Sequence, residues 1–220
     1  MNLLFLALTS IAFLSLAAAE TIPCAGGTLS NYTAAGFTCS IDELTFSGFS
    51  YNPTASGGAG VPDAGGVDVN PEKVGIESGF LFTAGWLVSE GQVEDSTIIY
   101  TATCHQCLID DVVLVMGGGA HISGTASVSE TSVTPFVSLL TGGSVLSDMT
   151  TISPGVSTIT ITKDIGVSGG TAPDGLAHIS TVNNLFSTNV TTATPEPSLG
   201  LLCLGVFALI PVARRKLRRL

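Results

Sequence analysis

Short runs in which apolar and polar residues alternate recur along most of the chain, and this alternation constrains the fold more than any other feature. In the run 157–162, Ile159 and Ile161 alternate with threonines. A period of two places successive side chains on opposite faces of a strand. Comparable runs cover 44–51, 76–88, 97–103, 111–116, 126–128, 133–140 and 177–186. Turn-forming residues separate the runs, and no segment carries a 3.6-residue apolar stripe. The pattern therefore predicts an all-β fold, an antiparallel β-sandwich or jelly-roll-like domain.

Glycine-rich stretches between these runs predict the connections. The segment 52–69 is rich in glycine and contains two prolines, which predicts a long surface loop or an irregular edge. The glycines at 117–119 and 142–143 are predicted to turn the chain between strands. Trp86 shares even-numbered positions with Phe80 and Phe82. This spacing favours packing in the core, and stacking on a sugar ring is the alternative.

The charge distribution excludes one class of partner. All 17 acidic residues lie between Glu20 and Pro197, but only Lys73 and Lys163 of the seven basic ones do. A surface this acidic repels phosphate backbones, so a nucleic-acid-binding function is excluded. The composition, 45% hydrophobic and 11% charged, is that of a globular chain rather than a disordered one.

The first residues have the pattern of an export signal. Residues 3–16 are almost continuously apolar, and Ala17, Ala18 and Ala19 follow them. A short apolar core followed by small residues is typical of a secretory signal peptide. We expect residues 1–19 to be recognised by the secretory translocon and removed by signal peptidase after Ala19.

The last residues form a tripartite tail. Its first part is Pro195, Glu196 and Pro197, and its second is an apolar stretch at 198–213. A helix of that length spans about 24 Å, short of a hydrocarbon core of roughly 30 Å. The terminus 214–220 carries five basic residues, Arg214, Arg215, Lys216, Arg218 and Arg219. Because basic residues stay on the cytoplasmic side, the tail predicts a single marginal transmembrane helix, with the domain 20–194 outside the cytoplasm.

Residues 195–220, with their Pro-Glu-Pro tripeptide, apolar span and Arg-rich end, resemble the PEP-CTERM sorting signal of Gram-negative bacteria. The resemblance implies that an exosortase, a membrane-embedded transpeptidase-like enzyme, recognises and cleaves the chain near Pro195, Glu196 and Pro197. The tripeptide is then a substrate site, not a catalytic one. The resemblance also implies an inner-membrane-anchored precursor that moves to the cell surface or an extracellular matrix containing exopolysaccharide. The segment 39–51 is similar to the opening of several uncharacterised ectodomains that carry this tail.

Four cysteines lie in the predicted exported domain, Cys24, Cys39, Cys104 and Cys107. A fifth, Cys203, lies in the apolar tail. In an oxidising compartment four cysteines allow three sets of pairs. The pairs Cys24–Cys39 and Cys104–Cys107 are favoured because each is local. The second would staple a turn between two strands, with His105 and Gln106 at its tip.

The spacing of Cys104 and Cys107 also fits a redox or a metal site. Thioredoxin-like sites, however, open a helix, whereas this motif lies between two strand-like runs. A zinc site would need further ligands, and His121 and His178 stand isolated in the sequence. A structural disulfide is the favoured interpretation, and we expect no metal and no cofactor.

Two further patterns bear on chemistry. Residues 166–170, Gly-Val-Ser-Gly-Gly, match a nucleophile elbow built on Ser168, but Pro173 and Gly175 prevent the helix that should follow, so a glycine turn is favoured. Acidic residues could supply oxygen ligands to calcium, but no recognisable calcium loop is present, and a solvated acidic surface is favoured. These acidic residues are Asp63 with Asp68, Glu94 with Asp95, and Asp110 with Asp111.

We therefore expect a non-enzymatic exported protein of the cell surface or the extracellular matrix, associated with exopolysaccharide or biofilm. A carbohydrate-binding or calcium-dependent adhesion module is the alternative. A secreted hydrolase that uses Ser168 is a further one.

Overall fold

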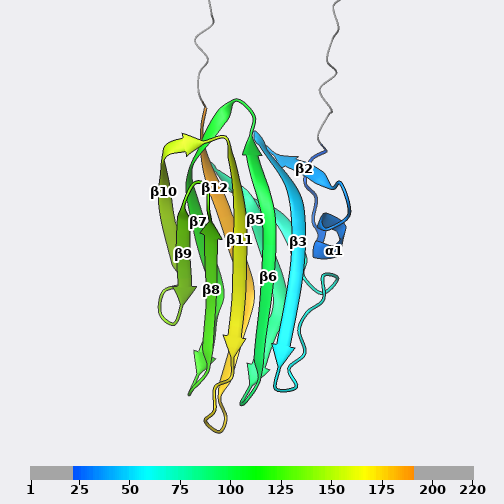
Figure 1. The fold of residues 1–220 in the computed structure, drawn as a ribbon, viewed down its shortest axis with the longest axis vertical. Coiled ribbons are helices and arrows are strands. Elements are labelled where there is room, and N and C mark those ends of the chain that lie inside the picture. Colours follow the sequence, from blue (N-terminus) through cyan, green and yellow to red (C-terminus); the bar gives the residue numbers. More distant parts are fainter. Residues whose placement is uncertain (1–21, 191–220) are drawn as a thin grey trace, which may run out of the picture.

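The computed structural model describes residues 22–190, which form two antiparallel six-stranded sheets packed face to face (Figure 1). Sheet A has the strand order β2-β3-β6-β11-β8-β9. Its strands are β2 (Thr38–Ile41), β3 (Leu44–Ser56), β6 (Val93–Cys104), β8 (Thr125–Ser132), β9 (Val137–Gly142) and β11 (Thr158–Ser168).

Sheet B has the strand order β1-β4-β5-β12-β7-β10. Its strands are β1 (Gly27–Thr28), β4 (Asp68–Val74), β5 (Glu77–Ser89), β7 (Cys107–His121), β10 (Ser147–Val156) and β12 (Leu176–Val190). A one-turn helix, α1 (Leu29–Tyr32), lies beside β3 at one edge (Figure 1). The two packed sheets confirm the predicted all-β sandwich.

The core fills the space between the sheets because the strands alternate as their sequences do. On β11 the odd-numbered residues Ile159, Ile161, Ile165 and Val167 are buried, and the threonines between the isoleucines face outward. Aromatic rings from both sheets meet in the middle of this layer: Phe46 of β3 packs edge-on against Phe80 of β5, with 4.6 Å between ring centroids. This interdigitation of side chains from both inner faces is what holds a sandwich together.

The glycines at 117–119 do not turn the chain as predicted; they lie inside β7. Opposite them, β12 has an irregularity between Ile179 and Thr181. A Cβ at Gly118 would lie 2.4 Å from the backbone oxygen of His178, so the backbones approach more closely here than a side chain allows. Glycine inside a strand often marks such a bulge or a close approach of two backbones.

Four strands lie outside the predicted runs, namely β1, β2, β4 and β10, and the last two each contain a proline. The segment 52–69 is only partly a loop: β3 continues to Ser56, and β4 begins at Asp68 and includes Pro71. The second unpredicted strand with a proline is β10, which contains Pro154. β10 is the edge of sheet B, and β1 pairs with β4 only at Asp68 and Val69, so neither proline interrupts a ladder on both sides. Proline is tolerated at such edges.

The run 133–140 was predicted as one strand, but β8 ends at Ser132 and β9 begins at Val137, so the first half of the run is the connection. The predicted signal peptide (1–19) and the sorting tail (195–220) with its transmembrane segment lie outside the described residues. Within residues 22–190, no helix is long and apolar enough to cross a membrane.

Candidate functional site

The residues predicted as the sorting signal, Pro195, Glu196 and Pro197, and the basic terminus lie outside the described residues. The structure does define the strand that leads toward them. β12 lies in the middle of sheet B, paired with β5 on one side and β7 on the other. Its last residue, Val190, is the register partner of Cys107. The tail is therefore attached to a central strand rather than to an edge.

The four cysteines of the domain stand at disulfide distance in the favoured pairs. The Cα atoms of Cys24 and Cys39 are 4.8 Å apart, and those of Cys104 and Cys107 are 5.4 Å apart. The second pair closes a turn, but this turn is not a hairpin, since β6 belongs to sheet A and β7 to sheet B. Because β6 and β7 are not paired with each other, the turn between them does not need the Gly or Asn of a two-residue hairpin.

The two histidines that stand apart in the sequence are neighbours in the structure. His121 at the end of β7 and His178 on β12 line one shallow hollow, because His121 pairs with Leu176 and His178 with Gly119. Their separation along the sequence therefore does not extend to the structure. Within residues 22–190, however, no group of three or more His, Cys, Asp or Glu side chains is placed to hold a metal ion.

Ser168 lies at the end of β11, where its hydroxyl accepts a hydrogen bond from the Gly170 amide at 3.3 Å. The glycines after it are required by close approach. A Cβ at Gly169 would lie 1.8 Å from the Ser89 backbone oxygen, and Gly170 has a φ of +70°. These contacts account for the Gly-Gly pair as a packed turn.

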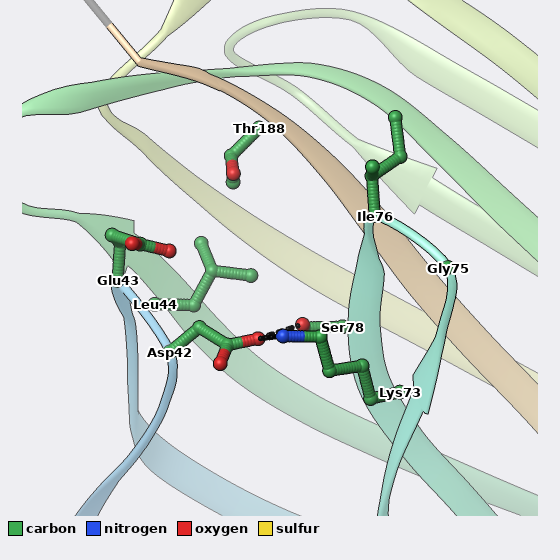
Figure 2. A pocket seen from close by; sticks show the side chains of 8 residues that line it. All are labelled: Asp42, Glu43, Leu44, Lys73, Gly75, Ile76, Ser78 and Thr188. Carbon is green, nitrogen blue, oxygen red and sulfur yellow. Dashed lines mark hydrogen bonds and ion pairs between the residues drawn. The ribbon is translucent and has the colours of Figure 1, made fainter.

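A small polar hollow lies where the β2–β3 turn meets β4 and β5 (Figure 2). Asp42, one of the lining residues, has a φ of 51°, and its carboxylate contacts two side chains. Lys73 Nζ lies 2.8 Å from Asp42 Oδ2, and the Ser78 hydroxyl donates a 2.8 Å hydrogen bond to the same oxygen. The Lys73 ammonium and the Ser78 hydroxyl hold the pKa of Asp42 below its usual value.

These contacts assign the hollow a structural role. Its volume is about 230 Å³, below the range of roughly 300–1,000 Å³ usual for small-molecule sites. Asp42 follows β2 of sheet A, whereas Lys73 and Ser78 belong to sheet B. The ion pair and the hydrogen bond therefore clasp the two sheets together at this end.

Trp86 is completely buried, and its indole Nε1 donates a 3.2 Å hydrogen bond to the Ser96 hydroxyl. The core position inferred from the alternation is thus the observed one, and Trp86 is not available to stack on a sugar. Glu94, two residues before Ser96 on the same face of β6, is also completely buried. Burial raises the pKa of Glu94 to about 7. Glu94 and Asp95 point to opposite faces and do not form a joint calcium site.

A lysine and a glutamate form a completely buried pair in the core. Lys163 of β11 and Glu130 of β8 are direct cross-strand partners, and neither side chain is exposed at all. Lys163 Nζ donates a short hydrogen bond to Glu130 Oε2. Lys163 is flanked on its own inward face by Ile161 and Ile165, which are also completely buried.

Two groups complete this set, which we call the Lys163 cluster: Lys163, Glu130, Asn184 and Tyr100. Asn184 comes from β12 in the opposite sheet, and its Nδ2 donates to Glu130 Oε1 at 3.0 Å and to the Val113 backbone oxygen at 3.1 Å. The Tyr100 hydroxyl, from β6, donates a short hydrogen bond to Asn184 Oδ1. Glu130 therefore contacts the amine with one oxygen and the amide with the other.

Burial changes the ionisation of this cluster. Removal from water raises the pKa of Glu130 and lowers the pKa of Lys163, and their mutual attraction opposes both shifts. Burial and the charge of Glu130 raise the pKa of Tyr100 well above its ordinary value, so its hydroxyl stays a donor. Burial thus acts on both groups in the direction of their neutral forms.

The Lys163 cluster was missed in the sequence, although a signal for it exists. Lys163 continues the odd-numbered inward series of Ile159 and Ile161, and it is one of only two basic residues between Glu20 and Pro197. Likewise Glu130 follows Val128 on an inward face, and Asn184 lies between Val182 and Phe186. A polar residue at an inward position of an otherwise apolar series is the signal.

Comparison with known proteins adds no assignment to this geometry. No protein-family model matches the chain, and no curated protein matches it.

Proposed function

We propose that this chain is an exported, non-enzymatic protein that a secretory signal delivers across the inner membrane and an exosortase processes at Pro195, Glu196 and Pro197. Its destination is the cell surface or an extracellular matrix with exopolysaccharide. The observation that carries the proposal is the attachment of the tail. β12, which precedes it, is a central strand bonded on both sides, so a pull on the tail is resisted by two ladders of hydrogen bonds.

Other features of the domain agree with a structural role outside the cytoplasm. The two disulfide-distance pairs suit an oxidising compartment. The polar contacts of the hollow around Asp42 are already used to join the sheets. An acidic sandwich with two cysteine pairs at disulfide distance fits a solvated matrix component.

The test is to express the full chain in a Gram-negative host with an exosortase and in the same host without it. We expect the extracellular product to lack Arg214, Arg215, Lys216, Arg218 and Arg219 only when the exosortase is present, as mass spectrometry of its carboxyl terminus would show. Glu196→Ala should retain the tail in the membrane fraction, whereas the matched control Thr194→Ala should be processed normally. An intact basic terminus on a cytosolic product would refute the proposal.

A further inference from the structure

We propose that Lys163 and Asn184 become covalently joined inside the folded domain, through an amide bond between Lys163 Nζ and Asn184 Cγ, with Glu130 as the proton-transfer group. The Lys163 cluster brings an amine, a carboxyl group and a primary amide together in a site closed to water. Lys163 lies on sheet A and Asn184 on sheet B, so the bond would cross the sandwich. This inference is independent of the sorting proposal.

The two side chains can span the required distance. Facing sheets lie about 10 Å apart, and a lysine and an asparagine side chain joined end to end cover roughly that distance. Glu130 brings both termini to one carboxyl group, because its two oxygens contact Lys163 Nζ and Asn184 Nδ2. Holding both reacting groups on one carboxyl group in this way replaces a bimolecular encounter.

The environment activates Lys163 as a nucleophile. An ammonium ion has no free electron pair, so the amine must first lose a proton, and Glu130 Oε2 is in place to accept it. The completely buried neighbours Ile161, Ile165 and Val128 supply apolar surroundings, which disfavour the charged form of the amine.

The environment also activates Asn184 as an electrophile. Tyr100 donates to Asn184 Oδ1, the oxygen on which negative charge develops when the amine attacks Cγ. The Asn184 nitrogen that must leave is held by Glu130 Oε1 and the Val113 carbonyl oxygen. The amide is therefore polarised at its oxygen and has a proton source at its leaving nitrogen.

The reaction needs no outside reagent. Nζ attacks Cγ, the Nζ–Cγ bond forms, and the Cγ–Nδ2 bond breaks. After Glu130 has taken the ammonium proton, it gives that proton to the departing Nδ2 and accepts a second proton from Nζ, so a molecule of ammonia leaves and Glu130 ends protonated. Nothing is oxidised or reduced. The product is a neutral secondary amide in place of a buried amine and a primary amide.

A bond between Lys163 and Asn184 would link the two sheets covalently. It would tie β12, the strand that leads to the tail, to β11 at the centre of sheet A. A force on the carboxyl-terminal side would then be carried by a covalent link between the sheets as well as by hydrogen bonds.

The experiment is mass spectrometry of the full chain, purified with its disulfides intact. The mass should be lower by one ammonia, about 17 Da, than the value calculated from the observed chain ends and two disulfides. Digestion with chymotrypsin and pepsin should give a branched peptide that joins the segments containing Lys163 and Asn184. These enzymes are chosen because the domain has few sites for trypsin. This measurement requires no variant to fold.

Variants then assign the roles. Lys163→Arg and Glu130→Gln should lose the branched peptide and keep the full mass. Asn184→Asp should still react, but with loss of water, so that its product has the mass of the wild-type product. The controls Lys73→Arg, at an exposed lysine, and Asn183→Asp, at the adjacent position, should both retain the branched peptide.

Three results would overturn the proposal: a wild-type chain of full mass with Lys163 and Asn184 on separate peptides, ammonia loss confined to a succinimide within one peptide, or undiminished branching in Lys163→Arg.

Discussion

Lys163 and Glu130 face each other across the β11–β8 ladder, and both are completely buried at the centre of the sandwich. On a solvent face such a pair would be an ordinary cross-strand contact. Between the sheets each ionisable group has lost its water and depends on its partner, so we expect the two residues to respond to substitution very differently from the exposed pair Lys73–Asp42.

We expect Glu130→Ala to lower the free energy of unfolding by about 3–5 kcal/mol, because it leaves the Lys163 amine buried without its partner. The matched control is Lys73→Ala. Lys73 and Asp42 side chains are 57% and 36% exposed, and exposed pairs contribute at most about 1 kcal/mol. Urea unfolding of both variants measures the difference. Equal losses would contradict the assignment of Lys163 and Glu130 as a desolvated pair.

The raised pKa of Glu94 predicts that the free energy of unfolding falls as the pH rises. Its pKa is about 7 in the folded protein and 4.5 ordinarily, so between these values the folded state binds more protons than the unfolded state. The contribution of Glu94 to the free energy of unfolding is therefore fully present below pH 4.5 and is lost as the pH rises through about 7. It amounts to about 3 kcal/mol.

Thermal or urea unfolding between pH 4 and 9 tests this dependence. Glu94→Gln should remove most of the fall in stability over this range, because glutamine stays neutral. Glu90→Gln, at an exposed position just before β6, should follow the wild-type profile. A Glu94→Gln profile that parallels the wild type would show that another group is responsible.

The two cysteine pairs should stabilise the domain to different degrees. Cys24 and Cys39 are separated by 15 residues and Cys104 and Cys107 by 3. The chain-entropy relation gives about 3 kcal/mol for the longer loop and about 2 kcal/mol for the shorter. We expect the double variant Cys24→Ala/Cys39→Ala to unfold at lower urea than Cys104→Ala/Cys107→Ala. The reverse order would mean that the inter-sheet turn is the more important staple.

A glycine pair on β5 offers a matched test of packing at the Lys163 cluster. A Cβ at Gly79 would lie 2.0 Å from the Asn184 backbone oxygen, whereas a Cβ at Gly85 would meet nothing within 4 Å. We expect Gly79→Ala to cost about 2 kcal/mol or more and Gly85→Ala to change stability by less than about 0.5 kcal/mol. Gly79→Ala should also reduce the yield of the branched peptide, since it displaces the backbone that carries Asn184.

The strands β4, β7 and β10 differ from the sequence prediction for physical reasons. Glycine at 117–119 has the same local signature whether it turns a chain or lets two strands approach, and only the bulge in β12 distinguishes the two. Pro71 and Pro154 argue against strands unless their unpaired sides face an edge. Which strand is an edge depends on the order of strands in the sheet, and that order is a long-range property.

The sequence by itself determined the class of fold and the inward faces of strands such as β5 and β11, because the alternation of side chains is a local consequence of extended backbone. It also indicated the cysteine pairs, since both are close along the chain. Only the tertiary structure decided which inward residues meet. Lys163, Glu130 and Asn184 each occupy a readable inward position, but the sheet order brings β8 beside β11 and lays β12 across them. Non-local pairing of this kind is set by the packing of whole sheets rather than by any segment alone.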